Sequence, residues 1–527
     1  MGGAFSIPVV FGLFSGAAAA GVSEDGSWDP DAWDPDAWDL IRVDEPAISD
    51  ALATSQYGSV LADPPLGTGL AWRVESIPEV DEVTAWEAQD ALQSWDWVDA
   101  EVDGTGVKVA VFDIQWTGAQ MRLDELGEVS THDCWAHRSC EPEMDTLRPR
   151  FSFELGSHGV ACAEVIRDIA PGVELHLVRV NGLTTLENAV DWAIREEIDV
   201  ISMSMSFFNE SFYDGTGAVN EQMDKLAEAG VLMVTSAGNY AEQHWTETFS
   251  DTDGDGQHEF RLDEDTTTEF LPIYFKTGTR KVHLIWNDFS NCGDTDLDAF
   301  VIDKNYDVVG WSNDVQHPAE DGCWPVERVR VSVEKSGWYW LSVVRTGGVP
   351  HVSMDIMARG GEVYNAMAEA SITDPGTHPQ VLTVGAVRAD DYLFNQPEHY
   401  SSRGPTHAGL DKPDLAGPDG LTTTVYGATG FYGTSASTPA VAAAVALVMS
   451  QEPGRTGAQA AQILMDGAFS QRSTWQAADQ GLGAGHVRLP SPSAKSRGCG
   501  EGLLFLSMVF WWPFLRWENR PGRRQRH

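Results

Sequence analysis

The chain has 527 residues, and its 79 acidic against 34 basic residues give a formal net charge of −45. A surface of this charge repels nucleic acid and anionic membrane surfaces, so nucleic acid is not an expected partner. The length is sufficient for two or three domains with full-sized hydrophobic cores.

The first 20 residues are mostly apolar and include many small residues, and four alanines at 17–20 offer an A-x-A-like cleavage site. A basic n-region is missing, since no Lys or Arg precedes Arg42. Because the apolar run is too short for a membrane anchor and is followed by acidic residues, we predict a signal peptide at 1–20. The alternative is an apolar tail without order.

Residues 21–85 contain a short acidic repeat. The sequence Trp-Asp-Pro-Asp-Ala occupies 28–32 and again 33–37, and a third copy begins at Trp38. Such a repeat cannot form a packed core, so we predict a linker or a pro-segment here.

The pattern after this segment is typical of an α/β fold. An almost continuous apolar run at 107–112 predicts a parallel strand buried on both faces, and Asp113 ends it. Further strands alternate with helices, which predicts a doubly wound, mostly parallel sheet with its site at the C-terminal edge. These elements are strands at 173–180, 198–203 and 231–235, and helices at 83–94, 159–169, 186–195 and 219–229.

A glycine-marked turn at 433–439 precedes a run of small apolar residues at 440–449 that predicts a buried helix. Pro439 fits the first turn of that helix, where a missing N–H costs nothing. Such a turn holds the hydroxyl of Ser435 at a helix N-terminus, where developing negative charge is favoured. Because a serine hydroxyl is a weak nucleophile alone, the chain must also supply a base.

Four stretches together resemble one family. They are Val-Lys-Val-Ala-Val-Phe-Asp at 107–113, Ser-His-Gly-Val-Ala-Cys-Ala at 157–163, Thr-Ser-Ala-Gly-Asn at 235–239 and Gly-Thr-Ser-Ala-Ser-Thr-Pro at 433–439. They are similar to the aspartate, histidine, oxyanion-asparagine and serine blocks of the subtilase (subtilisin-like serine peptidase) family, in its order. The resemblance covers roughly residues 90–245 and 364–490. Segments 371–375, 381–387, 400–405, 412–416 and 481–487 also resemble subtilase segments that carry no chemistry.

The resemblance implies roles for four polar residues. Ser435 would be the nucleophile and His158 the general base and acid, with Asp113 orienting His158. The side-chain amide of Asn239 and the backbone N–H of Ser435 would donate to the oxyanion.

The resemblance also implies which segments contact a substrate. Ser204, Met205 and Ser206 are similar to the segment that pairs with the substrate backbone and lines the specificity pocket. Ala237 and Gly238 precede the oxyanion asparagine and are also expected to contact the substrate.

Residues 246–361 exceed what the family core needs, and their apolar residues alternate in short runs typical of an antiparallel β-sandwich. We predict that the ends of this insert lie close together, as an insertion into a surface loop requires. The predicted strands are 270–275, 282–286, 299–302, 308–311, 329–333, 338–344 and 352–356.

The insert begins with an acidic loop. Asp251, Asp253 and Asp255 alternate with small residues, and Gly256 allows a sharp bend. Hard oxygen ligands so arranged suit calcium, although Leu262 stands where an EF-hand loop has its last glutamate. A structural calcium site is the prediction, and a solvated acidic loop is the alternative.

The six cysteines fit an exported protein. Cys134 and Cys140 are within reach of a loop disulfide, and Cys292 and Cys323 both lie in the insert. Cys162 falls on the inner face of the helix after His158 and is predicted to be a free buried thiol.

The C-terminal residues 491–527 comprise a Ser/Pro linker, Cys499, an apolar stretch at 503–515 and an arginine-rich end. They resemble bacterial C-terminal sorting tags made of a Cys-Gly motif, a short membrane span and a basic stop. The stretch is shorter than the ~20 residues of a full crossing. We therefore predict membrane anchoring through this tail, with an amphipathic or aggregation-prone tail as the alternative.

Together these features predict an exported subtilisin-like serine endopeptidase, secreted or attached to the bacterial cell envelope, that acts as a monomer on proteins or peptides. The expected fold is a doubly wound α/β sheet with an inserted antiparallel β-sandwich. A catalytically degenerate subtilase that acts as a surface binding protein, with the sandwich binding a polymer or partner, is the first alternative, because Ile114-Gln115-Trp116 and Val160 depart from the family pattern. An esterase with the same triad is the second. The predicted segments are 1–20, 21–85, 86–245, 246–361, 362–490 and 491–527.

Overall fold

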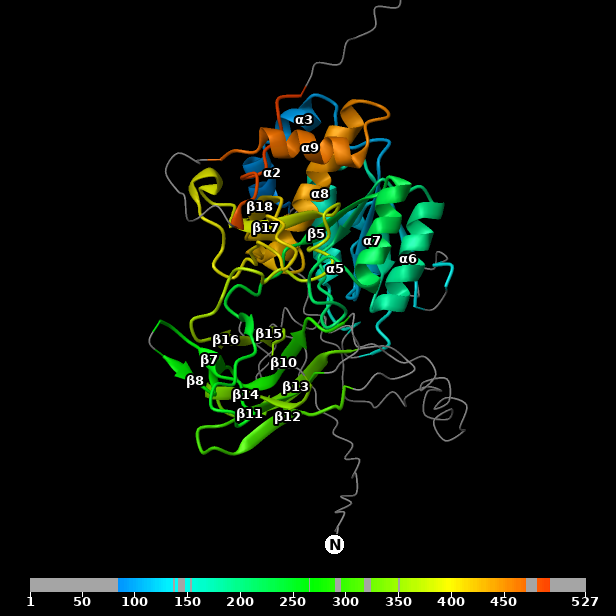
Figure 1. The fold of residues 1–527 in the computed structure, drawn as a ribbon. Coiled ribbons are helices and arrows are strands. Elements are labelled where there is room, and N and C mark those ends of the chain that lie inside the picture. Colours follow the sequence, from blue (N-terminus) through cyan, green and yellow to red (C-terminus); the bar gives the residue numbers. More distant parts are fainter. Residues whose placement is uncertain are drawn as a thin grey trace, which may run out of the picture. The chain divides into compact units, whose positions relative to one another are not determined.

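The protein is represented by a computed structural model (Figure 1). The predicted signal peptide, the acidic repeat, Cys292, Cys323 and the C-terminal tail with Cys499 lie outside the described residues. Within those residues, no helix combines the length and the apolar character that a membrane crossing requires. The described residues are 84–135, 138–140, 147–151, 154–264, 266–289, 295–316, 324–348, 351–470 and 481–492.

A seven-stranded parallel sheet forms the centre of the α/β part, in the order β18-β17-β5-β4-β1-β3-β2. The predicted doubly wound, mostly parallel sheet is therefore confirmed. Its strands are β1 (Lys108–Asp113), β2 (Val129–Asp133), β3 (Glu174–Arg179), β4 (Val200–Met203), β5 (Leu232–Ser236), β17 (Leu382–Arg388) and β18 (Leu415–Asp419).

Helices cover both faces of this sheet (Figure 1). Successive side chains of β1 point to opposite faces, so Val109 and Val111 pack with α5 and α8, while Ala110 and Phe112 pack with α6 and α7. The helices are α2 (Trp86–Leu92), α3 (Trp95–Asp99), α4 (Leu123–Leu126), α5 (His158–Ile169), α6 (Leu183–Arg195), α7 (Ala218–Ala229), α8 (Thr434–Gln451), α9 (Gly457–Gly467), η1 (Ala119–Met121) and η4 (Tyr392–Phe394).

Two antiparallel sheets face each other in the inserted part and enclose an apolar core of their own. The predicted β-sandwich is thus present. One sheet has the order β13-β10-β15-β6 and the other β12-β11-β14-β9-β16. The strands are β6 (His244–Thr248), β9 (Leu271–Phe275), β10 (Gly278–Trp286), β11 (Asp296–Ile302), β12 (Val308–Ser312), β13 (Val326–Val333), β14 (Gly337–Gly347), β15 (Ser353–Arg359) and β16 (Gly361–Val363).

The first and last strands of the sandwich, β6 and β16, are not among the seven strands predicted from the sequence. Each is short and is completed by a distant partner, β15 for β6 and β9 for β16. The two ends of the insert are adjacent, because Val363 N donates to Glu242 O at 2.9 Å. Four further strands of the described residues form two two-stranded sheets, β7 (Phe260–Arg261) with β8 (Thr267–Thr268) and β19 (Leu421–Thr423) with β20 (Gly427–Phe431).

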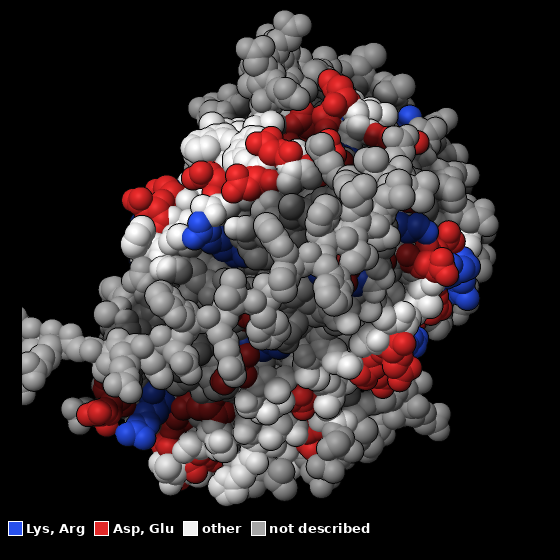
Figure 2. Space-filling view, turned by 90° about the horizontal axis from the view of Figure 1, so that it is seen from above, with Lys and Arg blue, Asp and Glu red and all other residues white. Residues whose placement is uncertain are grey.

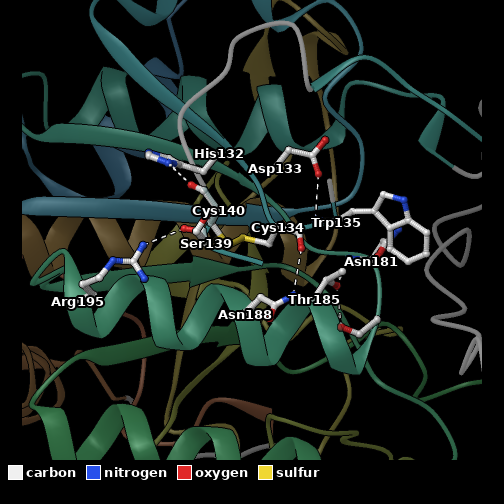
Figure 3. Close-up of a disulfide and its surroundings, with 11 residues drawn as sticks. His132, Asp133, Cys134, Trp135, Ser139, Cys140, Asn181, Thr185, Asn188 and Arg195 are labelled. Atoms are coloured by element: carbon white, nitrogen blue, oxygen red, sulfur yellow. Dashed lines mark hydrogen bonds between the residues drawn. A yellow bond between two sulfur atoms is a disulfide. The ribbon is translucent and has the colours of Figure 1, made fainter. Parts of the chain in front are cut away.

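The loop after β2 is closed by a disulfide between Cys134 and Cys140, as predicted (Figure 3). Helix α6 braces this loop, because Asn188 donates to Cys134 O at 3.2 Å and Arg195 donates to Ser139 O at 2.8 Å. Cys162 is a free buried cysteine, also as predicted.

The sandwich is joined to the α/β part by the His244–Asp355–His407 cluster, in which two histidines share one buried carboxylate. Asp355 Oδ2 accepts from His244 Nε2 at 2.8 Å and from His407 Nε2 at 2.9 Å. His244 and Asp355 belong to β6 and β15, whereas His407 lies in the loop before β18, where its ring stacks on Phe212. The sandwich and the α/β part thus meet at a largely buried polar contact.

One face of the molecule is acidic (Figure 2). Figure 2 shows many more acidic than basic side chains on the face that it draws. This agrees with the excess of 79 acidic over 34 basic residues in the whole chain.

Candidate active site

Asp113 and His158 form a buried pair at the C-terminal edge of the sheet. Asp113 is the last residue of β1. The sequence predicted that the helix would begin at residue 159, just after His158, but His158 is itself the first residue of α5. His158 Nδ1 lies 2.8 Å from Asp113 Oδ2, and Gln115 N donates to Asp113 Oδ1 at 2.8 Å. Because Nδ1 faces a carboxylate it carries a proton, which leaves Nε2 as the nitrogen that takes one up.

The close approach of α5 to β1 depends on Gly159. A Cβ built on this residue would lie 2.7 Å from Asp113 Cβ, which real side chains do not tolerate. The glycine after the histidine therefore lets the helix begin directly against the strand that carries the aspartate.

Cys162 places the start of α8 beside this pair. Its Sγ lies 3.8 Å from His158 Nδ1 and 3.8 Å from the backbone oxygen of Ser435. Ser435 is the second residue of α8, and its relative exposure is only 7%. His158 and the backbone of Ser435 thus both lie close to the sulfur atom of Cys162.

The charge of His158 depends on two opposing effects. Burial alone lowers the pKa of His158, but negative charge on Cys162 and on Asp113 raises it, and the net pKa lies above the ordinary 6.5. Burial also raises the pKa of the Cys162 thiol, which keeps it uncharged near neutral pH. Near neutral pH it is therefore the carboxylate of Asp113, and not Cys162, that stabilises the protonated ring of His158.

Asn239 is fixed in one orientation. Its Oδ1 accepts from Thr434 N and from Thr434 Oγ1, both at 3.0 Å. A backbone N–H only donates, so the oxygen of the amide faces Thr434 and the Nδ2 end is directed elsewhere. Gly433 leaves the space for this arrangement, since a Cβ there would lie 3.0 Å from Asn239 Nδ2.

The predicted position of Pro439 in the first turn of the helix is wrong. Helix α8 begins at Thr434, because Gly433 with φ of 100° ends the preceding turn, and Pro439 is its sixth residue. Pro439 has no N–H to bond the carbonyl of Ser435 four residues earlier. That carbonyl accepts instead from Ser204 Oγ at 3.0 Å.

The five predicted substrate-contacting residues lie in the two buried segments that flank the start of α8. Ser204 directs its hydroxyl to Ser435, Ser206 is buried, and the buried Met205 packs in the core on the α6–α7 face. Ala237 N donates to Val384 O at 2.9 Å, and Gly238 N donates to Thr434 Oγ1 at 3.2 Å. The structure thus assigns contacts within the protein to these groups.

The acidic loop brings its three carboxylates together. Ligand atoms of Asp251, Asp253 and Asp255 all lie within 4.8 Å of one another. The amides of Gly254 and Gly256 donate to Asp251 at 2.8 and 3.2 Å, and both glycines have positive φ. The oxygen donors suit a hard divalent cation such as calcium.

Sequence reasoning missed one contributor to the site, the segment 400–405. Ser402 N donates to Gly238 O at 2.9 Å, and Tyr240 N donates to Ser402 Oγ at 3.0 Å. The segment therefore holds both sides of Asn239. Its family resemblance was the available signal, but that signal gives no spatial position.

The sequence model of the subtilase family matches residues 104–257 and 331–485. The chain therefore belongs to the subtilase family of serine peptidases. No curated protein sequence matches the chain.

Solved proteases have a similar fold. The CspB protease of Clostridium perfringens is 16% identical with a TM-score of 0.52, and the match covers 77% of this chain and 98% of that one. MycP1 with its N-terminal propeptide removed is 16% identical with a TM-score of 0.40, over 77% and 95% of the two chains. At these identities the likeness concerns the fold alone.

Proposed function

We propose that the chain is a serine endopeptidase that hydrolyses peptide bonds through Asp113, His158 and Ser435. The observation that carries the proposal is the buried Asp113–His158 pair, which lies beside the N-terminus of the helix that bears Ser435. The family of the chain, serine peptidases, supports the same reaction.

In this mechanism Ser435 Oγ attacks the carbonyl carbon of the scissile bond while His158 Nε2 takes the hydroxyl proton. The oxyanion receives hydrogen bonds from Asn239 Nδ2 and from the backbone N–H of Ser435, one of the first amides of α8, which have no acceptor within the helix. His158 then gives its proton to the leaving amine. A water molecule, activated in the same way, releases the acyl group from Ser435.

Labelling with a serine-directed fluorophosphonate tests the assignment of the nucleophile. We expect the wild-type protein to be labelled on Ser435 and the Ser435→Ala variant to remain unlabelled. Loss of the nucleophile should lower kcat by about 10⁶-fold. Peptide cleavage that survives Ser435→Ala in purified protein would refute the assignment, and hydrolysis of esters but not peptides would favour an esterase.

A catalytically degenerate binding protein gives the opposite result in the same experiment. Such a protein would leave Ser435 unlabelled while the circular dichroism spectrum shows a folded chain. His158→Ala is the matched control, because it keeps the serine and removes the base. An active enzyme loses its labelling in this variant.

We further propose that calcium binds at Asp251, Asp253 and Asp255, supported by the convergence of their oxygen atoms. A ligand that binds only the folded state adds about 2.7 kcal/mol to the free energy of unfolding when its free concentration is 100 times its Kd. A chelator should therefore lower the Tm, and added calcium should restore it. The double variant Asp253→Asn/Asp255→Asn should melt alike in both conditions; identical wild-type curves with and without chelator would leave the loop as solvated acid.

For localisation, we propose export and attachment to the cell envelope through the tail around Cys499, which lies outside the described residues. The motif, the short apolar stretch and the terminal arginines support this proposal. Mass spectrometry of the exported protein should find a C-terminus near Cys499 or a modified Cys499. A soluble protein that ends at His527 with unmodified Cys499 would contradict it.

A further inference from the structure

The turn that precedes Ser435 is held by two side chains from distant segments. Gly433, the residue before α8, has φ of 100°, and its N–H points to Asp419 Oδ2 at 3.0 Å. The same N–H lies 3.2 Å from the hydroxyl oxygen of Tyr400. The next amide, that of Thr434, donates to Asn239. Two successive amides before Ser435 are therefore each fixed by a side chain.

Asp419 is built into the core. It is the last residue of β18 and is fully buried, and the Tyr400 hydroxyl donates to the same Oδ2 that accepts from Gly433. Among the described residues, Asp419 Oδ1 has no hydrogen-bond partner. A buried carboxyl group with one such oxygen has a position at which a proton can reside without displacing either hydrogen bond.

Tyr400 connects this carboxylate to the candidate oxyanion donor. Its backbone oxygen accepts from Ala241 N at 3.1 Å, two residues after Asn239. Its hydroxyl contacts both Asp419 and Gly433. One residue thus braces the loop of Asn239 with its backbone and the turn before Ser435 with its side chain.

We propose that Asp419 is a positioning residue of the active site, which holds the Gly433 amide and thereby the turn that carries Ser435, with Tyr400 as its support. The inference rests on the proposed function of Ser435. Asp419 contacts Gly433 and not the reacting atoms, so its contribution is to fix where the serine hydroxyl and the first amides of α8 lie.

The groups around Asp419 make this hold sensitive to pH. Burial raises the pKa of Asp419 to about 7, against the hydrogen bonds from Tyr400 and Gly433 that lower it. The negative charge of Glu398 raises this pKa and the positive charge of Arg388 lowers it. A hydrogen bond to a carboxylate is roughly twice as strong as one to a neutral acid. The turn is therefore held tightly above the pKa of Asp419 and more loosely below it.

Asp419→Asn tests the proposal, because an amide keeps the acceptor and imitates the protonated acid. We expect kcat and the rate of fluorophosphonate labelling to be about 5-fold lower than wild type at pH 9, with KM little changed. At pH 5.5, where wild-type Asp419 is itself protonated, the two proteins should become equal. Titration of His158 affects both proteins alike, so the ratio between them isolates Asp419.

Two further variants sharpen the test. Tyr400→Phe removes a hydrogen bond that lowers the pKa of Asp419. The pKa of Asp419 should therefore be higher in that variant, so the ratio of its kcat to that of wild type should change at a higher pH. Asp391→Asn is the matched control, because Asp391 is exposed and its backbone φ of 52° suits asparagine. This control should keep the wild-type profile.

Hydrogen exchange of the peptide 427–436 gives a readout that does not need activity. Relative to wild type at the same pH, Asp419→Asn should exchange faster at pH 9 and equally at pH 5.5. A rate ratio independent of pH, or equal exchange at pH 9, would overturn the proposal even if Ser435 is labelled. If Ser435 is not labelled in wild type, the proposed function fails and hydrogen exchange still decides whether Asp419 holds the turn.

Discussion

Two buried Asp–His pairs in this protein have the same hydrogen-bond distance and different surroundings. In the α/β part His158 Nδ1 lies 2.8 Å from Asp113, and in the sandwich His244 Nε2 lies 2.8 Å from Asp355. The other ring nitrogen of His244 lies 2.7 Å from the backbone oxygen of Met367. A carboxylate and a carbonyl only accept, so both nitrogens of His244 carry protons.

The comparison shows that a buried Asp–His bond by itself does not define a catalytic pair. His244 is held as an imidazolium with both nitrogens bound to acceptors, so it cannot serve as a base. The chemistry proposed for His158 needs only Nε2, and the start of α8 with Ser435 lies beside this ring. What surrounds the second nitrogen decides between a structural and a chemical role.

Replacing the same carboxylate at each pair separates the two roles most clearly. Asp113→Asn should lower kcat by about 10⁴-fold, because the amide no longer stabilises the imidazolium or fixes the reactive tautomer of His158. The unfolding midpoint in urea should change less than in Asp355→Asn. Steady-state kinetics on a peptide substrate measures the effect, and an unaltered kcat would assign Asp113 to structure.

Asp355→Asn should have the converse effect. It leaves His244 and His407 without their shared carboxylate, and breaking such a buried pair costs about 3–5 kcal/mol of the free energy of unfolding. Labelling of Ser435 in the protein that remains folded should persist. A variant as stable as wild type would show that the cluster does not hold the two parts together.

The pH dependence of the His244–Asp355 pair follows from its pKa values. Interaction with Asp355 raises the pKa of His244 above 6.5 despite burial. The stability that this interaction contributes to the folded state is therefore fully present below pH 6.5 and is lost as the pH rises through the raised pKa. Burial opposes ionisation of Asp355, but the two histidines lower its pKa to about 2. The stability contributed by Asp355 is therefore fully present above pH 3.8 and is lost as the pH falls towards 2. The difference between wild type and His244→Gln in urea should therefore be larger at pH 5 than at pH 10.

Asn239, the proposed oxyanion donor, contacts the start of α8, because its Oδ1 accepts from Thr434 N at 3.0 Å. Asn239→Ala should lower kcat on the order of 10²–10³-fold with little change in KM, since the charge exists only in the transition state. Asn239→Asp is the matched variant, because it keeps the acceptor for Thr434 and replaces the donor. A raised KM with unchanged kcat would place Asn239 in substrate binding.

The sequence by itself predicted the strands β1, β3, β4 and β5 of the central sheet and the residues of the candidate site, but not the edge strands β2 and β18. Strands buried on both faces leave near-continuous apolar runs, and the run before Asp113 became β1 with that residue at its C-terminal end. The four short blocks identified Asp113, His158, Asn239 and Ser435, because local turn chemistry and family resemblance both reside in adjacent residues.

Only the tertiary structure decided how these residues are supported. Pro439 can lie inside α8 because a distant residue satisfies the carbonyl that it leaves without an N–H donor. The hydroxyl of Ser204, 231 residues from Ser435, donates to Ser435 O in place of that N–H. Strands β6 and β16 exist because partners far along the chain complete them. Asp419, Tyr400 and the His244–Asp355–His407 cluster carry no sequence signal that links them to their partners. Their roles arise from contacts between distant segments, which no local pattern records, and from burial, which makes each charge depend on its neighbours.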